Sequence, residues 1–245
     1  MGIGTVNIGP NYNEQVALGL IKGARGAVYT GLTTSAAMGT IEDIKTSGGN
    51  LVYLDAAELI DISSTSVNDT LLGTGVRKVA VIGLDNDLRE ITETVEMNGV
   101  TPVSTTLEYK RVNLLTAMEV GSLEENEGDV SAIDQSLNIQ NQIGIGHNVS
   151  KQQNFTIPVG FRGIFKWASI STGKNDECII SYTTRSAITK SPFLLLTTVQ
   201  VFSSALVFVK VDTAIPAGTD VKILAEAITN NPKIATTIAL NIIPE

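Results

Sequence analysis

Short runs of alternating apolar and polar residues recur along most of the chain and are separated by Gly, Asn and Pro. One such run extends from residue 76 to residue 82 and ends at Gly83. Successive side chains of a β-strand point to opposite faces of its sheet, so this alternation is typical of half-buried strands. The pattern predicts an all-β protein made of antiparallel sheets.

The clearest hairpin signal is the pair Asn98-Gly99, which stands between the runs 91–97 and 100–106. An Asn-Gly pair readily supplies the positive φ angles of a type I′ turn, and this makes it the strongest short-range hairpin signal. The sequence therefore predicts that these two runs pair with each other.

The runs form two series, which predicts two β domains. The first series has candidate strands at 51–54, 59–62, 76–82, 91–97, 100–106 and 109–120. Residues 124–129 then bring four carboxylates and a glycine together, which indicates a loop and a boundary. The second series has candidate strands at 137–145, 153–158, 163–171, 178–185, 194–202, 206–211, 221–228 and 234–243. We predict a first β domain at 46–133 and a second β-sandwich, similar to a jelly roll, at 134–245.

The first 45 residues differ from the rest because glycine and other small residues dominate them. Asn13 is a candidate cap for a short helix in which Val16, Ala17, Leu20 and Ile21 share one face. Such a segment has too few large apolar residues for a core of its own. We predict an N-terminal arm at 1–45 that packs on its own body or on a neighbouring subunit; a flexible terminus is the alternative.

Composition and charge exclude several classes of function. The net charge is −8 and the sequence pI is about 4.7, which disfavours binding to phosphate backbones, so no nucleic-acid partner is expected. No apolar run approaches the roughly 18–20 residues that a membrane-spanning helix needs. A single cysteine excludes an internal disulfide framework and fits assembly in a reducing cytosol. The N-terminal residues do not read as a secretory signal.

Candidate catalytic and metal-binding residues are few. His147 is the only histidine, and Cys178 lies in an apolar strand pattern, so nucleophilic catalysis is disfavoured. Calcium would need oxygen ligands from loops, and two acidic clusters qualify by composition: Asp85, Asp87 and Glu90, and then Glu124, Glu125, Glu127 and Asp129. Neither cluster matches a calcium-loop pattern, and we interpret both as solvated turns. We therefore predict a non-enzymatic protein with no catalytic, cofactor-binding or metal-binding residues.

Two further patterns have a structural interpretation. Glu90, Glu93 and Glu96 could suggest a glycosidase pair, but strand alternation places Glu93 on the opposite face from the other two. Phe165 and Trp167 stand two residues apart, so we expect both on the core face of one strand.

Several strings, in this order, resemble those of a family of virion structural proteins of tailed bacteriophages. They are Gly73-Thr74-Gly75-Val76-Arg77, Ile82-Gly83-Leu84-Asp85-Asn86-Asp87, residues 90–99, Thr101-Pro102-Val103, Gly121, Asn126-Glu127-Gly128-Asp129-Val130, residues 155–160 and residues 215–221. The resemblance runs from about residue 50 to the C-terminus and leaves residues 1–45 unmatched.

This resemblance implies a β-sandwich component of a virion that is assembled in the bacterial cytoplasm and has no catalytic residues. The expected partners are other copies of the chain, in a homo-oligomer such as a trimer, and the major capsid protein or the neck and tail proteins. The first expectation is a capsid decoration or cement protein. A neck, tail or fibre-base adaptor and a carbohydrate-binding host-attachment module are the alternatives.

Overall fold

The computed structural model of the protein describes residues 12–33, 36–202, 206–209, 213–229 and 232–245. Within these ranges one short helix accompanies seventeen strands, and every pair of neighbouring strands is antiparallel. The predicted all-β, antiparallel class is confirmed. The elements are α1 (Tyr12–Ala17), β1 (Arg25–Thr33), β2 (Ile41–Asp43), β3 (Asp61–Ser64), β4 (Val76–Leu84), β5 (Glu90–Glu96), β6 (Val103–Ser104), β7 (Arg111–Val120), β8 (Val130–Ile133), β9 (Ile139–Ile143), β10 (Asn154–Thr156), β11 (Phe161–Thr172), β12 (Glu177–Ser186), β13 (Leu194–Phe202), β14 (Leu206–Val209), β15 (Ala214–Ile215), β16 (Thr219–Ala227) and β17 (Ile234–Pro244).

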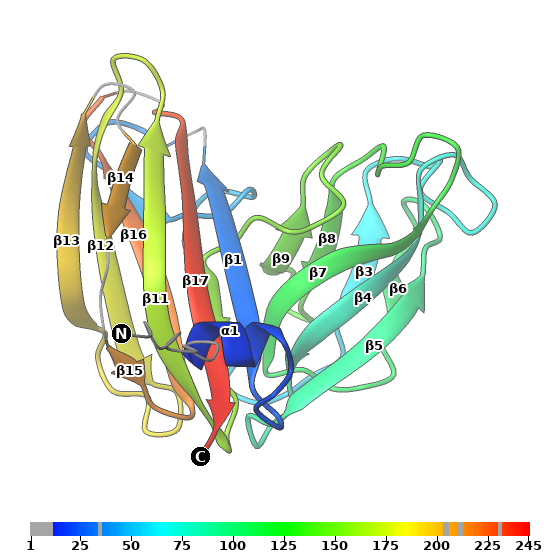
Figure 1. The fold of residues 1–245 in the computed structure, drawn as a ribbon. Helices are drawn as coiled ribbons and strands as arrows, with labels where there is room; N and C mark the ends of the chain where they lie inside the picture. Colours follow the sequence, from blue (N-terminus) through cyan, green and yellow to red (C-terminus); the bar gives the residue numbers. More distant parts are fainter. Residues whose placement is uncertain (1–11, 34–35, 203–205, 210–212, 230–231) are drawn as a thin grey trace, which may run out of the picture.

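The strands form four sheets, and the two largest enclose one hydrophobic core. The front sheet has the order β1-β17-β11-β14, with β15 paired to β11, and the back sheet has the order β10-β16-β12-β13, with β2 paired to β16. Buried apolar side chains from both sheets form a single cluster that includes Phe155, Ile180, Ile223 and Leu240. We call this part the large lobe; it is the left-hand part of Figure 1.

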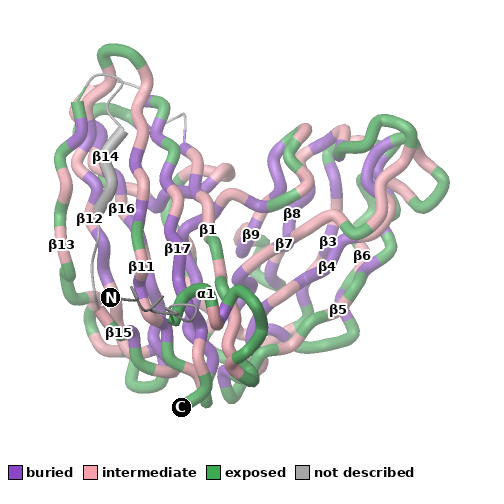
Figure 2. The backbone as a smooth tube through the Cα atoms, in the orientation of Figure 1, coloured by how far each residue is buried: buried purple, intermediate pink, exposed green. Residues whose placement is uncertain are grey.

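The other two sheets form a smaller lobe with its own core. One has the order β6-β3-β8-β9 and the other β5-β4-β7. Their shared cluster of buried residues includes Ile62, Val79, Tyr109, Leu115 and Val130. Figure 2 shows buried positions alternating with more exposed ones along strands of both lobes, as the sequence pattern predicts for half-buried strands.

The smaller lobe is inserted into the middle of one strand of the large lobe. β2 pairs with residues 224–226 of β16, and β10 continues along the same strand at residues 220–222. Between them the amide of Ile44 donates to the carbonyl of Ile223 (3.1 Å), and the amide of Gln153 donates to the carbonyl of Ile44 (3.0 Å). The chain leaves after Lys45 and returns at Gln152, and these two residues bridge each other. We call residues 46–152 the insert.

The predicted domain boundaries differ from this arrangement at two places. Residues 25–33 and 41–43 of the predicted arm are strands of the large lobe, because β1 pairs with β17 along nine residues and β2 pairs with β16. The predicted boundary after residue 133 separates β8 from β9, which pair in one sheet of the insert. The arm thus packs on its own body at residues 25–33 and 41–43, while residues 1–11 and 34–35 lie outside the described residues.

The predicted hairpin at Asn98-Gly99 is wrong. β5 pairs with β4, and β6 pairs with β3, so the turn carries the chain from one sheet of the insert to the other. Gly99 does adopt a positive φ of 62°. Its amide donates to the carbonyl of Asp69 (2.8 Å), however, and its carbonyl accepts from Ser64 (2.9 Å). Contacts with a loop 30 residues earlier in the chain therefore replace the expected hairpin contacts.

The predicted N-terminal helix is present but shorter than expected. It ends at Ala17, and Val16 is its one buried residue. Leu20, which was expected on the apolar face, is largely exposed. In the described part of the chain no helix is long and apolar enough to span a membrane.

Candidate functional site

The first predicted acidic cluster forms a closed turn between β4 and β5. One carboxylate oxygen of Asp85 accepts the amides of Asp87 (2.9 Å) and Arg89 (2.8 Å). Asp87 pairs with Arg89, and Glu90 pairs with Arg25 of β1. Protein donors therefore already engage the carboxylates of this turn.

Protein donors also engage two carboxylates of the second acidic cluster, Glu127 and Asp129, whereas Glu124 and Glu125 are exposed. Glu127 accepts the side-chain amide of Asn68 (2.7 Å) and the hydroxyl of Thr74. Asp129 accepts the amide of Ile145 (3.1 Å). Within the described ranges, no group of three or more His, Cys, Asp and Glu side chains is arranged to hold a metal ion.

The lone histidine and the lone cysteine lie in different lobes. His147 is in a loop of the insert, with Nδ1 3.1 Å from Lys151 Nζ, and partial burial followed by the charge of Lys151 lowers the pKa of its imidazole. Cys178 is fully buried in the core of the large lobe, as its apolar strand pattern predicts. Burial raises the pKa of its thiol to about 12, so it remains protonated near neutral pH.

The expectation that Phe165 and Trp167 share the core face is wrong. β11 has a bulge between these residues where it pairs with β17, and an extra residue reverses the side-chain alternation beyond it. Phe165 packs in the core, whereas the Trp167 side chain lies on the outer face with 38% of its surface exposed. The bulge has no signature in the sequence.

This difference predicts unequal losses of stability. Phe165→Ala is expected to cost about 3–5 kcal/mol of unfolding free energy, because it leaves a cavity in the core. Trp167→Ala is expected to cost much less. Urea denaturation followed by circular dichroism compares the two variants; equal losses would contradict the placement of Trp167.

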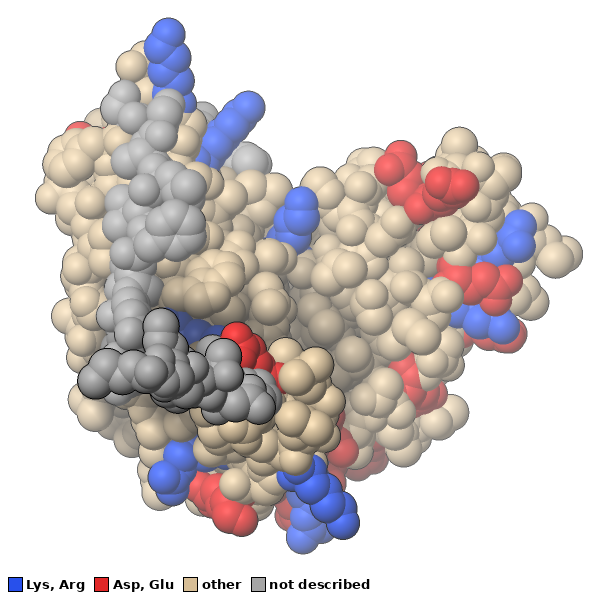
Figure 3. Space-filling model, in the orientation of Figure 1, with Lys and Arg blue, Asp and Glu red and all other residues tan. Residues whose placement is uncertain are grey.

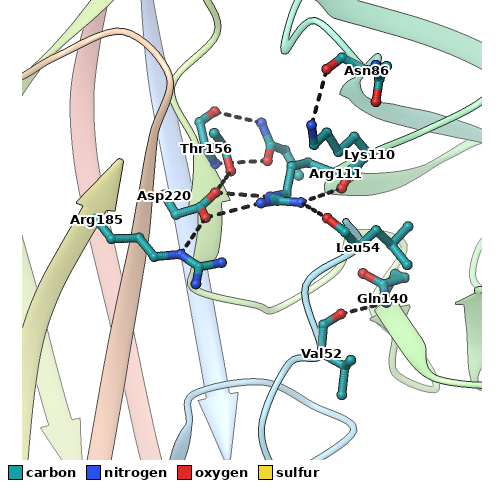
Figure 4. Close-up of polar contacts among 10 residues, drawn as sticks. Val52, Leu54, Asn86, Lys110, Arg111, Gln140, Thr156, Arg185 and Asp220 are labelled. Atoms are coloured by element: carbon teal, nitrogen blue, oxygen red, sulfur yellow. Dashed lines mark hydrogen bonds and ion pairs between the residues drawn. The ribbon is translucent and has the colours of Figure 1, made fainter. Parts of the chain in front are cut away.

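Among the described residues, buried polar side chains gather most densely at the junction between the insert and the large lobe. Asp220 of β16 is fully buried, and its two oxygens accept Nε (3.0 Å) and Nη2 (3.2 Å) of Arg111 from β7. The same carboxylate accepts Nε of Arg185 from β12 (2.9 Å) and the hydroxyl of Thr156 from β10 (2.6 Å). Figure 4 shows these three strands and β7 converging on Asp220. One carboxylate thus joins the two lobes.

Main-chain groups and aromatic rings complete the contacts of the two guanidinium groups. Nη1 of Arg111 donates to the carbonyls of Leu54 (2.9 Å) and Lys110 (2.7 Å). The Tyr53 ring lies 4.8 Å from the Arg111 guanidinium and 4.5 Å from that of Arg185. The Phe193 ring lies 4.6 Å from the Arg185 guanidinium. Cations over aromatic faces are attracted to them, and more strongly where water is excluded.

Two further contacts extend the junction along the inserted strand. Asn113 of β7 donates to the Thr156 carbonyl (3.0 Å) and accepts the Thr156 amide (3.0 Å). Asp43 is fully buried and accepts the Leu51 amide (2.6 Å), and Lys222 Nζ lies 3.1 Å from it. The junction therefore fixes the insert by paired charges and hydrogen bonds on both sides of the split strand, which predicts that the two lobes move as one body.

Another buried carboxylate, Asp69, organises the far end of the insert. Its oxygens accept the amides of Val76 (2.8 Å), Glu127 (3.0 Å) and Gly128 (2.9 Å) and the hydroxyl of Ser64 (2.5 Å). The approach is so close that a Cβ on Gly75 would lie 2.0 Å from Asp69 Oδ1. The Gly-rich strings around residues 73–75 and 126–129 thus meet at the Asp69 carboxylate, and the string around residues 98–99 contacts the Asp69 main chain.

The loops held by Asp69 carry exposed apolar residues. These residues are Val67, Leu71, Leu72, Val100 and Leu123, and we call them the insert tip. Leu72 has 91% of its surface exposed. Ordered loops that present large apolar side chains to solvent are typical of interaction surfaces. Sequence reasoning missed both the tip and the junction, because neither follows from local spacing.

No protein-family model matches the chain, and no curated protein matches it.

Proposed function

We propose that this chain is a non-enzymatic structural component of a tailed-bacteriophage virion, most simply a decoration or cement protein on the capsid. The observation that carries the proposal is the junction: the most elaborate polar site of the described chain joins two lobes. Such a site gives a rigid building block with surfaces in a fixed relation to each other. A decoration protein needs this rigidity, because it must meet a lattice and its own neighbours at once.

The strand order of the large lobe supports the proposal. We propose that this lobe is a jelly roll. In a jelly roll the first strand pairs with the last, the second with the second-last, and so on toward the middle of the chain. The pairs β1–β17, β10–β16, β11–β14 and β12–β13 follow this order. Jelly rolls recur in viral capsid and lectin domains. We also propose that the insert is a second, smaller sandwich, because its two sheets share one core.

The surface of the protein also fits lateral assembly. Figure 3 shows most acidic and basic side chains toward the rims of the molecule and few of them on the uncovered part of the face over β17 and β1. Pairing such a face with a neighbour removes few charges from water, which lowers the cost of burial. The neck, tail and fibre-base adaptor remains the alternative within the same class of protein.

One observation favours a second class of function. Trp167 lies partly exposed on a sheet face, and an exposed tryptophan can stack on a sugar ring. A carbohydrate-binding module for host attachment would use it. Glycan-array binding that Trp167→Ala abolishes would establish this function, and an array without binding would reject it.

Immuno-electron microscopy of the purified virus tests the main proposal. Antibodies against the purified chain are expected to label the head surface densely. Labelling confined to the neck or tail would favour the adaptor. If the antibodies bind the purified chain but label no particles, a role in the virion is contradicted. Leu72→Asp is expected to weaken attachment to particles without unfolding the chain, because the side chain is almost fully exposed.

A further inference from the structure

The outermost strand of the back sheet, β13, has one free side. It pairs with β12 along residues 194–202, and no strand in the described part of the chain pairs with its other side. Figure 1 places β13 on the side of the large lobe opposite to the insert. The backbone N–H and C=O groups on this side therefore remain available to a further strand.

This edge lacks most of the features that keep sheet edges apart. The sequence of β13, LLLTTVQVF, contains no charged residue and no proline. Leu194, Leu195 and Phe202 are 66%, 62% and 54% exposed. Its one irregularity is a bulge at Leu196, between the pairs Tyr182–Thr197 and Thr183–Leu195. A long, exposed and apolar edge strand is an aggregation hazard in a protein that leaves it uncovered.

We propose that a second copy of this chain covers the edge, with the two β13 strands antiparallel about a two-fold axis at Thr198. This register uses all nine residues and pairs Leu194 of each copy with Phe202 of the other. Thr198 of one copy then faces Thr198 of the other. Aromatic–aliphatic pairs such as Leu194–Phe202 and Thr–Thr pairs are both favourable across antiparallel strands. The exposed apolar residues lie at both ends of β13 and the hydroxyls at its centre, which is the symmetry that an isologous contact requires.

Charge also favours a second copy. Two chains of net charge −8 repel each other over much of their surface, and the contact is least costly where ionisable side chains are absent. β13 meets this condition along its whole length. A strand that carried acidic residues, such as β5, would place like charges opposite each other in the same arrangement.

An apolar pocket beside the edge provides a second, independent observation. Leu196 and Thr197 line it together with Phe165, Tyr182 and Val221. The Tyr182 hydroxyl is buried and has no hydrogen-bond partner within the described residues. In the proposed register Val199 of the second copy lies beside Thr197, at the edge of this pocket. The dimer would therefore cover an apolar surface that the single chain leaves open.

This inference deepens the proposed function by naming its self-contact, but it is measured on the purified chain without virus. A monomeric chain found on the virion would contradict only the dimer, whereas a dimeric chain absent from the virion would contradict only the virion role.

The first test is cysteine cross-linking. Thr198→Cys is expected to form a disulfide-linked dimer under mild oxidation, because the two introduced thiols face each other across the axis. Thr101→Cys, at an exposed turn of the insert, is the matched control. The buried Cys178 is expected to leave the unmodified chain uncross-linked. Equal cross-linking of the two variants would overturn the proposed contact.

The second test measures the mass of the protein in solution by light scattering. The unmodified chain is expected to be dimeric, and Thr198→Lys is expected to weaken the dimer roughly tenfold or more, because two ammonium groups would face each other. Thr101→Lys is the control, and circular dichroism verifies folding. A monomeric unmodified chain, or an oligomer that a folded Thr198→Lys variant leaves intact, would overturn the proposal.

Discussion

Asp220→Ala is expected to lower the free energy of unfolding by about 3–5 kcal/mol, the typical cost of removing one partner of a buried ion pair. The substitution leaves the buried guanidinium of Arg111 and the largely buried one of Arg185 without their shared carboxylate. It also removes the acceptor of the Thr156 hydroxyl. Because β7 and β16 belong to different lobes, the same substitution should loosen the insert on the large lobe.

Denaturation by urea, followed by circular dichroism and by the fluorescence of the single tryptophan, measures this loss. Trp167 is in the large lobe and reports its unfolding. Asp55→Ala is the matched control, since Asp55 also pairs with a cation of the large lobe, Lys190, but is exposed. The control substitution is expected to leave the free energy of unfolding nearly unchanged, because exposed ion pairs contribute little to stability. A loss for Asp220→Ala as small as that of the control would contradict a junction held by buried charge.

Asp69→Ala is expected to destabilise the insert by about 3 kcal/mol or more, because it leaves three buried or partly buried amides and one hydroxyl without an acceptor. The amides are those of Val76, Glu127 and Gly128. Asp69→Asn should also destabilise, since one acceptor oxygen becomes an NH₂ group that faces donors. The loops of the insert tip should then lose their fixed arrangement.

Hydrogen exchange is the sharpest measurement for this site. The amides of Val76 and Gly128 are expected to exchange faster in both Asp69 variants, whereas amides in the core of the large lobe should keep their protection. Asp129→Ala is the control, because Asp129 is more exposed and accepts a single amide. Unchanged exchange at Val76 in Asp69→Ala would show that the carboxylate does not organise these loops.

Strand positions were the most predictable part of the fold. The run 194–202 is β13 to the residue, and 178–185 and 234–243 fall within one or two residues of β12 and β17. Alternation sets these positions locally, because it reports which side chains face the core. The exceptions are the run 51–54, which is not a strand, and four strands that the sequence did not predict: β1 and β2 within the predicted arm, β8 at Val130–Ile133 and β15 at Ala214–Ile215.

Strand pairing was far less predictable, because partners are distant in the sequence. β1 pairs with β17, more than 200 residues later, and β2 and β10 act as two halves of one strand. No local pattern marks Lys45 and Gln152 as the points where the insert leaves and rejoins. The Asn98-Gly99 turn shows the same limit: Gly99 has the predicted positive φ but Asn98 does not, so the turn is not type I′, and its hydrogen-bond partners come from the segment around Ser64 and Asp69.

The junction was hidden for the same reason. Arg111 and Asp220 are 109 positions apart, and each alone is an ordinary charged residue on a strand. The local signal at Asp220, a charge within an apolar strand pattern, indicates an outward-facing side chain. Asp220 does point to the outer face of its own sheet, but the insert covers that face at this point. The site therefore exists only because the insert packs on the sheet and brings Arg111 to Asp220.

Counting copies of the chain per major capsid subunit, by quantitative mass spectrometry of purified virus, tests the central claim most directly. A decoration protein is expected at hundreds of copies per particle, in a fixed ratio to the capsid subunit. About six to a few dozen copies would instead indicate a neck, tail or fibre-base ring. Absence of the chain from intact particles would contradict a structural role in the virion.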